Sequence, residues 1–429
     1  MAGIKIAIAI TVATSMLGLP QSNSVYQRKT LKNDSYGGRK MITYCNVCNT
    51  KVRGGYKSLL KNLVGINGDY VQEICRCEKC GFIFVKNPLT KEQLDEKYKN
   101  FSKYEFDNKQ TVIQQGYLRR CIDQKSFIEN SINTDTYDTV LEIGAASGFN
   151  LSLYKTKTVY GIEPSKWNCE NAKNNYEVNM FAGTFEEYMN SERNDKFDLI
   201  FLSHTLEHIA NPCDFIKQCA KINNNYIFIE VPSFDYKVKD EPFGMFTDEH
   251  VNLFTFESLQ NLMNLTGYEL VNAQIPFCIG DIAPSGYPSL RTLWKKSNSI
   301  KKYKAVFTTK LLFDSYISWS EKAMDDICKK IDSIKGDKKI ALWGIGNTAA
   351  RILGATNLGK KNIVRAYDSD KRKHGIYFAG VEITAFDEND IKNGLIDTVI
   401  ITSCTAQKAL SEILNKYKNE INIVTLFEI

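Results

Sequence analysis

The chain has 429 residues, of which 43% are hydrophobic and 24% are charged, and its net charge is +6. This length exceeds one hydrophobic core and predicts two or three globular domains. Six basic residues and a single acidic residue fall within residues 1–40, so the rest of the chain is close to neutral. A near-neutral body argues against a nucleic-acid-binding protein.

The first residues form an apolar stretch from Ile4 to Leu19 that is interrupted by Lys5. With its small residues it resembles a short secretory h-region, and it is too short to be a convincing membrane span. The cysteines beyond residue 100 are scattered, which suits a reducing compartment. We therefore expect a cytoplasmic protein in which residues 1–40 are a dispensable extension and Met41 is the functional start.

Two C-x-x-C turns separated by 28 residues lie near the N-terminus: Cys45 with Cys48, and Cys77 with Cys80. Each turn directs two thiolates to one point, and four thiolates complete the tetrahedral site that structural zinc prefers. Cys75 could replace Cys77 by spacing, but the glycine after Cys80 favours the Cys77/Cys80 pair. Unligated thiols are the alternative. The sequence predicts a zinc-binding module over residues 41–86 whose closed metal site has a structural role.

A helical connector is predicted over residues 87–130, and an alternating βα region over residues 131–290. The predicted elements of that region are strands Thr139–Ile143, Thr158–Ile162, Phe197–Leu202 and Tyr226–Val231, and helices Ser165–Tyr176 and Pro212–Ile222. Alternating strands and helices indicate a mostly parallel sheet with ligands at the carboxyl ends of its strands.

A glycine-rich turn follows the first of these strands, and a carboxylate ends the second strand nineteen residues after the first glycine: Glu142, Gly144, Ala146, Gly148 and Glu163. Glycines there let a backbone approach a ligand closely, and a carboxylate at the next strand end accepts both ribose hydroxyl protons. Ala146 stands where a dinucleotide loop has a glycine. The pattern resembles motif I and the ribose-binding acid of class I S-adenosylmethionine (SAM) methyltransferases. An ordinary βα turn with two helix-packing glycines is the alternative.

Histidines follow the strand Phe197–Leu202, at Ser203-His204 and then at His208. Residues at this strand end face the methionine half of a cofactor and its acceptor. For His208 a second interpretation stays open, in which the residue begins a helix and hydrogen-bonds its backbone.

His250 follows Asp248 and Glu249, before the apolar residues of FTFESLQNLM. An acidic neighbour can orient one imidazole nitrogen, and the ordinary pKa of histidine lies near neutrality, so His250 is a general-base candidate. A satisfied structural histidine in a loop is the rival interpretation.

A basic helical linker is predicted over residues 291–335, and a second βα series over residues 336–429. The strands of that series are Ile340–Trp343, Val364–Tyr367, Thr398–Thr402 and Ile423–Leu426. Gly344 and Gly346 follow the first strand, and Asp368 and Asp370 end the second. The third glycine of a dinucleotide loop is missing, which favours a structural or substrate-holding role over a second nucleotide site. An oxidoreductase that binds NAD at Gly344 is the alternative.

The order of these motifs resembles the three-domain sugar C-methyltransferase family over residues 41–429. The resemblance implies an α/β protein: a zinc-binding module, a class I methyltransferase domain with a Rossmann-like sheet, and a C-terminal Rossmann-like domain that helps hold a nucleotide-linked sugar. It implies SAM as cofactor, with Zn²⁺ structural. The cofactor residues would be Glu142, Gly144, Ala146, Gly148, Glu163 and Ser203. The acceptor would be a nucleotide-linked keto-deoxysugar, with His250 as base beside Glu249 and His204, and polysaccharide biosynthesis is the expected setting.

Two positions depart from the family. Thr247 stands where a tyrosine is expected shortly before the base histidine, and the C-terminal loop GIGNTAAR lacks the usual lysine before its Gly-Asn pair. Related enzymes that share the EH-x-x-x-F-T segment methylate a hydroxyl, in which case His250 would deprotonate an alcohol. A non-catalytic zinc-ribbon protein that binds nucleic acid or protein is the competing class. The sequence names neither the sugar, the methylated atom nor the oligomeric state.

Overall fold

The computed structural model describes residues 43–52, 54–66, 68–94, 97, 115–191, 193, 195–235, 241–274, 288–297 and 299–428. The extension at residues 1–40 and the predicted start at Met41 lie outside them. Among the described residues, no helix combines the length and the apolar character that crossing a membrane requires.

The central part of the chain builds a mixed sheet of seven described strands. Their spatial order is β12 (Tyr268–Gln274), β13 (Ser289–Lys296), β10 (Asn223–Pro232), β9 (Phe197–Ser203), β6 (Thr139–Ile143), β7 (Thr158–Glu163) and β8 (Met180–Ala182). The five strands from β10 to β8 are parallel, while β13 and β12 are added antiparallel. The four strands predicted for this region are confirmed, and the parallel strands carry the continuous apolar runs expected when both faces are buried.

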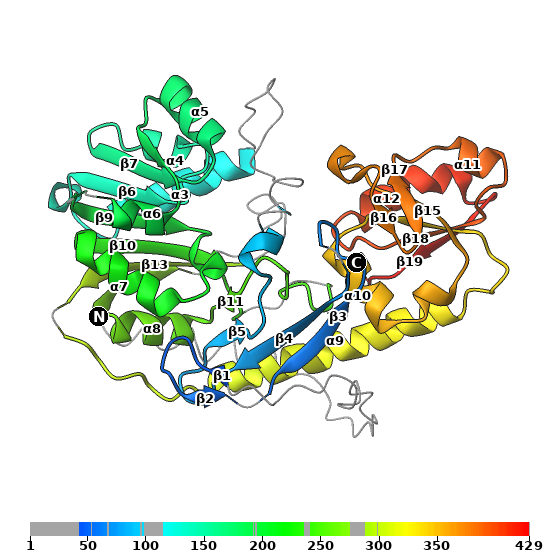
Figure 1. Cartoon of the computed structure of the whole chain (residues 1–429), viewed down its shortest axis with the longest axis horizontal. Helices are drawn as coiled ribbons and strands as arrows, with labels where there is room; N and C mark the ends of the chain where they lie inside the picture. The colour runs from blue at the N-terminus through cyan, green and yellow to red at the C-terminus, as the bar shows by residue number, and fades with distance from the viewer. Residues whose placement is uncertain are drawn as a thin grey trace. The chain divides into compact units, whose positions relative to one another are not determined.

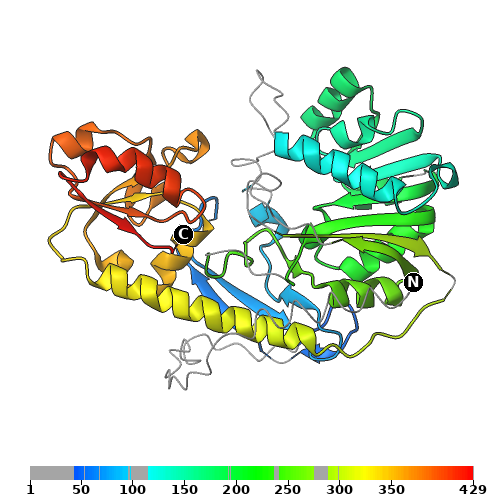
Figure 2. The same ribbon diagram turned by 180° about the vertical axis from the view of Figure 1, so that it is seen from behind.

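Helices cover both faces of this sheet. They are α3 (Gln115–Glu129), α4 (Phe149–Ser152), α5 (Lys166–Tyr176), α6 (Phe185–Asn190), α7 (Pro212–Ile222) and α8 (Phe256–Leu265). Residues of α6, α7 and α8 share one core with one sheet face, and residues of α3, α4 and α5 share another core with the opposite face. Figure 1 shows α7 and α8 on the first face, and Figure 2 shows α3 on the second. This three-layer α/β arrangement is the predicted Rossmann-like methyltransferase fold.

Helix α7 illustrates how local sequence fixes an element. The side chain of Asn211 caps the helix by accepting from the backbone N–H of Asp214, and Pro212 occupies the first turn, where its missing N–H costs nothing. Phe215, Ile216, Cys219 and Ile222 recur at helical spacing and bury one face. The predicted bounds, Pro212–Ile222, match the structure.

The predicted helical stretch from Arg291 begins instead as strand β13, so that part of the prediction is wrong. Residues Ser289–Trp294 are all buried, because β13 lies between β10 and β12. Arg291 is buried on an ion pair with Glu230 of β10, with Nε 2.6 Å from Oε2. An internal arginine breaks the apolar pattern that marks a strand, which hid β13 from periodicity. The helix proper is α9 (Thr308–Asp332).

The cysteine-rich part forms two small antiparallel sheets. One pairs β1 (Thr43–Tyr44) with β2 (Lys51–Val52), and the other has the order β11 (Asn252–Leu253), β5 (Ile83–Val85), β4 (Tyr70–Arg76) and β3 (Tyr56–Leu60). Strand β11 comes from the segment that follows His250 and lies 167 residues after the end of β5. The cysteine-rich module and the chain segment that follows the seven-stranded sheet's strand β10 are therefore joined by backbone pairing.

The C-terminal part is a second α/β unit. Its sheet has the order β16 (Tyr377–Phe378), β17 (Val381–Thr384), β15 (Ile363–Tyr367), β14 (Ile340–Trp343), β18 (Thr398–Ile401) and β19 (Asn422–Thr425). All pairs except β16 with β17 are parallel. The accompanying helices are α10 (Asn347–Ala355), α11 (Asn389–Lys392) and α12 (Gln407–Leu414). The four strands predicted for this region are confirmed within one residue at each end.

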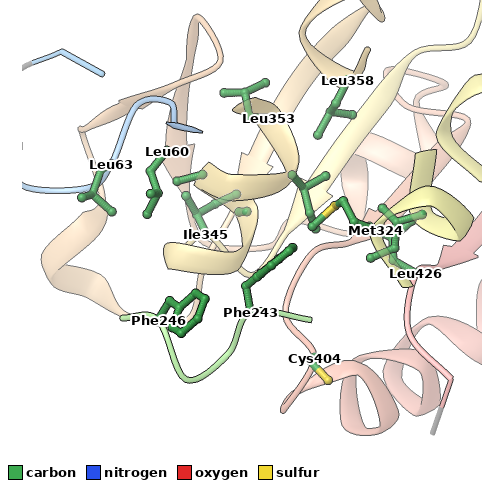
Figure 3. Packing of buried hydrophobic residues seen from close by; sticks show 14 of the residues in the cluster. Leu60, Leu63, Phe243, Phe246, Met324, Ile345, Leu353, Leu358, Cys404 and Leu426 are labelled. Atoms are coloured by element: carbon green, nitrogen blue, oxygen red, sulfur yellow. The ribbon is translucent and has the colours of Figure 1, made fainter. Parts of the chain in front are cut away.

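A common apolar core joins this C-terminal unit to the cysteine-rich module. Figure 3 shows Leu60 and Leu63 close to Ile345 and Leu353, with Phe243 and Phe246 beneath them. At Gly354 of α10, an added Cβ would lie 2.1 Å from the carbonyl oxygen of Leu59, so the helix backbone lies directly on β3. No side chain larger than hydrogen fits there without displacing one of the two elements.

Candidate active site

The four cysteines of the two C-x-x-C turns converge. Their sulfur atoms lie within 4.8 Å of one another, and the Cys45–Cys80 and Cys48–Cys77 pairs are each 3.5 Å apart. Zinc–sulfur bonds of about 2.3 Å place the sulfurs of a tetrahedral site about 3.8 Å apart, so the group fits the ion. The predicted alternative ligand, Cys75, lies on β4 outside this group. The structure therefore provides a group of four cysteines that could hold zinc.

The glycine-rich turn leaves β6 in a backbone conformation that side chains disfavour. Gly144, Ala146 and Gly148 have φ values of 78°, 45° and 74°, all in the left-handed region. A Cβ at Gly144 would lie 2.8 Å from Oγ1 of Thr205, and one at Gly148 would lie 2.7 Å from Cβ of Ala172. Both glycines are thus required for packing as well as for the turn.

Glu163, at the end of β7, stabilises this turn by hydrogen bonds. Its Oε2 accepts from the backbone N–H of Ala146 at 3.0 Å, and its Oε1 accepts from the backbone N–H of Ser165 at 3.0 Å. The side chain is 9% exposed, which places a fixed carboxylate at the carboxyl end of the strand beside the glycine turn. This is the position from which a carboxylate reaches ribose hydroxyls in nucleotide sites.

Glu142 is buried beneath the turn. Its Oε1 accepts from Asn150 Nδ2 at 3.0 Å, while its Oε2 has no hydrogen-bond partner in the described part of the chain. Burial raises the pKa of Glu142 to about 8, although Asn150 and Arg120 oppose the shift. A buried carboxyl oxygen without a partner beside a nucleotide-type turn fits a ligand with hydrogen-bond donors, and SAM carries such donors.

The pKa of Glu142 gives a pH-dependent prediction for Glu142→Gln. Because the folded pKa lies above the unfolded one, the contribution of Glu142 to stability is fully present below about pH 4.5 and is lost as the pH rises through 8. The neutral amide does not titrate. The free energy of unfolding of the variant, relative to wild type, should therefore rise by about 1.4 kcal/mol per pH unit between pH 6 and 8, then level off. Urea unfolding of wild type and variant at each pH measures this difference in free energy. The exposed Glu170→Gln serves as the control. A difference that does not change with pH would contradict the raised pKa of Glu142.

A network of charged side chains begins at the end of β9 with the half-buried His204 and continues to the buried Glu207 and Glu230. His204, with φ of 53°, places Nδ1 3.2 Å from Oε1 of Glu207 and Nε2 3.5 Å from Oε1 of Glu230, which also pairs with Arg291. Burial lowers the pKa of His204, but the two carboxylates outweigh it and the net shift is upward. His204 is therefore held between two acids that favour its protonated form. The neighbouring Ser203 accepts from Gln124 Nε2 at 2.9 Å through its hydroxyl.

His250 lies near this chain in the loop before β11. Its backbone N–H donates to Oγ1 of Thr247 at 3.1 Å, and its ring lies 5.0 Å from the ring of His208. Burial lowers the pKa of His250 to about 4, despite the opposing charge of Glu207. The imidazole is thus neutral at physiological pH and has a lone pair with which to accept a proton.

The acidic neighbours of His250 in sequence are engaged elsewhere. The carboxylates of Asp248 and Glu249 both pair with Lys97, the latter with Oε1 at 2.8 Å from Nζ. The side chain of Asn347, at the start of α10, also donates to Oδ1 of Asp248 at 2.6 Å. The carboxylate that lies close to His250 is instead Glu207. It stands in HTLEH between His204 and His208, and the sequence alone does not mark it as a site residue.

The loop that carries His250 is held by two other parts of the chain. Gln72 of β4 donates to the carbonyl oxygen of Thr247 at 2.7 Å. Arg351 of α10, which is 3% exposed, donates to the carbonyl oxygens of Phe243 at 2.9 Å and Phe246 at 2.5 Å. Both the cysteine-rich module and the C-terminal unit therefore position the segment before His250. Neither contact had a sequence signal.

At the second glycine turn, the protein's own groups engage the carboxylate that could otherwise bind a ligand. Gly344, with φ of 96°, borders a cavity of about 200 Å³ at the carboxyl ends of β14 and β18. Asp368 Oδ2 accepts there from the backbone N–H of Ile345 and from Lys373 Nζ, both at 2.8 Å. A carboxylate neutralised by its own lysine supports the predicted structural or substrate-holding role.

Comparison with known proteins gives two family matches. A family model described as a methyltransferase domain matches residues 91–273. A second model, described as C2185-like, N-terminal, matches residues 336–424. A search of curated proteins found no match.

Solved structures of methyltransferases resemble part of the chain. One, an S-adenosylmethionine-dependent methyltransferase from Clostridium acetobutylicum, is 11% identical, with a TM-score of 0.32 over 48% of this chain and 99% of its own. Another, the 1,6-didemethyltoxoflavin-N1-methyltransferase of Burkholderia thailandensis with bound S-adenosylhomocysteine, is 12% identical, with a TM-score of 0.36 over 53% of this chain and 96% of its own.

The family match covers every described strand of the seven-stranded sheet except β13, together with the glycine turn and Glu163. The position of that turn, between strand ends and beside a buried carboxylate, agrees with the cofactor site of such a domain. The chain therefore contains a class I SAM-dependent methyltransferase domain.

Proposed function

We propose that the protein is a sugar methyltransferase that C-methylates a nucleotide-linked keto-deoxysugar. The observation that carries this proposal is the position of His250, whose partly shielded ring lies beside His208 near the carboxyl end of β9 in the methyltransferase sheet. A methyltransferase that acts on carbon needs such a base, because the carbon beside a ketone must lose a proton before it becomes a nucleophile.

In this proposal SAM supplies an electrophilic methyl group whose sulfonium charge already activates it. His250 accepts the proton from the carbon beside the ketone. His204 lies between Glu207 and Glu230, and in its protonated form it would place positive charge near the enolate oxygen that then forms. The remaining task of the site is to hold acceptor and cofactor in line.

The cofactor would be held by the residues around the glycine turn: Glu142, Gly144, Ala146, Gly148, Glu163 and Ser203. Zinc would be held by Cys45, Cys48, Cys77 and Cys80 in a structural role. We place the enzyme in the cytoplasm, where SAM and reduced thiols are available, with surface-polysaccharide biosynthesis as its setting.

Replacing Glu163 by Ala should weaken SAM binding about 10- to 100-fold, because a charge-assisted hydrogen bond to the ribose would be lost. Isothermal titration calorimetry measures the dissociation constant, with thermal unfolding to show that the turn survives the loss of its bonds to Ala146 and Ser165. The control is Glu170→Ala, an exposed carboxylate on the adjacent α5. Unchanged affinity in a folded variant would refute the cofactor assignment.

O-methylation of a polysaccharide sugar is the second candidate, and Thr247 favours it. The family's tyrosine is replaced by a short side chain whose oxygen already accepts from the backbone of His250. His250 would then deprotonate a hydroxyl. Incubation with SAM and a panel of nucleotide-linked keto sugars and hydroxyl sugars, followed by NMR location of the new methyl, separates the two reactions. A panel without any methylated product would count against both.

A further inference from the structure

We propose that Glu207, His208 and His250 form a binding site for a divalent transition-metal ion, separate from the four-cysteine group. One ligand atom from each lies within 4.8 Å of the others. The ligands come from the short helical turn η2 (Leu206–His208) and from the loop before β11. Two imidazoles and one carboxylate form a ligand set that suits zinc, iron(II), cobalt(II) and nickel(II) better than magnesium or calcium.

The tautomer of His208 is set for metal binding. Its Nδ1 lies 3.1 Å from the carbonyl oxygen of Glu249, and because a carbonyl only accepts, Nδ1 carries the hydrogen. The lone pair is then on Nε2. Metal-binding histidines are held in this way, with the distal nitrogen donating to a backbone carbonyl or a carboxylate.

Glu207 brings a buried oxygen that lacks a partner. The residue is 1% exposed, and in the described part of the chain neither of its carboxylate oxygens has a hydrogen-bond partner. Oε1 lies 3.2 Å from Nδ1 of His204, which Glu230 contacts from the other side. Burying a carboxylate oxygen without a partner is unfavourable, and a bound cation would satisfy it while His204 supports the carboxylate from behind.

Hydrogen bonds already tie together the two segments that carry the ligands. The backbone N–H of Val251 donates to the carbonyl oxygen of Glu207 at 2.9 Å. The side chain of Asn252 donates to the carbonyl oxygens of Leu206 at 3.0 Å and Ile209 at 2.6 Å. The site is therefore largely assembled before a metal ion arrives, which lowers the entropic cost of binding.

The consequence for catalysis rests on the proposed function. A single lone pair on His250 cannot hold a metal ion and accept a proton from the acceptor at the same time. Occupation of the site therefore blocks the base, and transition-metal ions inhibit methyl transfer.

The test is cobalt binding to the full-length protein with zinc in its cysteine site. After equilibrium dialysis against Co²⁺, elemental analysis should find one cobalt ion per chain beside the zinc, with a weak visible absorption that lacks thiolate charge transfer. His208→Asn and His250→Asn should each weaken cobalt binding at least about tenfold. The control is His374→Asn in the C-terminal unit, where the ring hydrogen-bonds the carbonyl oxygen of Asp368.

Wild-type protein that holds one zinc ion and no second metal ion, or two folded variants that bind cobalt like wild type, would overturn the metal site. Thermal unfolding of each variant identifies a folding defect. If one of the two histidine variants does not fold, cobalt binding to the other one tests the metal site. The activity assay is scored separately. Inhibition in proportion to bound cobalt supports the competition with the base, whereas activation would leave the metal site standing and overturn the role of His250 as base.

Discussion

Replacing His250 by Asn is expected to reduce kcat for methyl transfer about 10²- to 10⁴-fold, the usual contribution of a positioned general base. Asparagine retains the approximate size of the side chain, and the backbone N–H that donates to Thr247 is unchanged. It lacks an imidazole nitrogen that accepts a proton. SAM affinity should stay within about twofold of wild type, because the glycine turn and Glu163 are untouched.

His374→Asn is the matched control, because it exchanges the same residue types in the C-terminal unit. Initial rates at saturating SAM, with the sugar identified by the panel, give kcat, and calorimetry gives the SAM dissociation constant. Full turnover in folded His250→Asn protein would show that this histidine has a structural role. His208 would then be the candidate base.

The sequence predicted those elements whose pattern is local. Strand β6 (Thr139–Ile143) and helix α7 (Pro212–Ile222) have the expected bounds, since an apolar run buried on both faces and a capped amphipathic helix are legible from consecutive residues. The four cysteines were likewise found by spacing. The glycine turn and Glu163 could be predicted to be neighbours, because they follow two consecutive strands of one parallel sheet.

The parts that sequence could not supply depend on distant residues. Arg291 looked like part of a basic linker because its partner Glu230 lies 61 residues earlier, on the strand it pairs with. Strand β11 is two residues long, which is too short for any periodic signal. Glu207 could not be recognised as the carboxylate near His250, because only the fold brings residues 207 and 250 together.

The pairing of β5 with β11 gives the cysteine-rich module a second role beyond its own fold. The backbone N–H of Val85 donates to the carbonyl oxygen of Val251 at 2.9 Å, one residue after His250. Gln72 of the same module holds Thr247, three residues before it. The four-cysteine module and His250 are therefore linked through hydrogen bonds to the loop that carries this histidine.

Replacing Cys77 by Ser should remove bound zinc and lower the free energy of unfolding by several kcal/mol, since metal binding contributes directly to the stability of such modules. Methyl transfer should fall with it, because β5 then no longer holds the His250 loop. Elemental analysis, urea unfolding and initial rates measure the three effects. Chelation of zinc from wild type should reproduce all three.

The matched control is Cys75→Ala, which removes a buried thiol of the same module from outside the four-cysteine group. It should keep its zinc and most of its activity, and lose only the stability expected for a small cavity, about 1 kcal/mol. If Cys77→Ser also retained zinc and stability, the four-cysteine site would be refuted. If it lost zinc but kept full activity, the metal would stabilise the module alone, and the β5–β11 pairing would not be what positions His250.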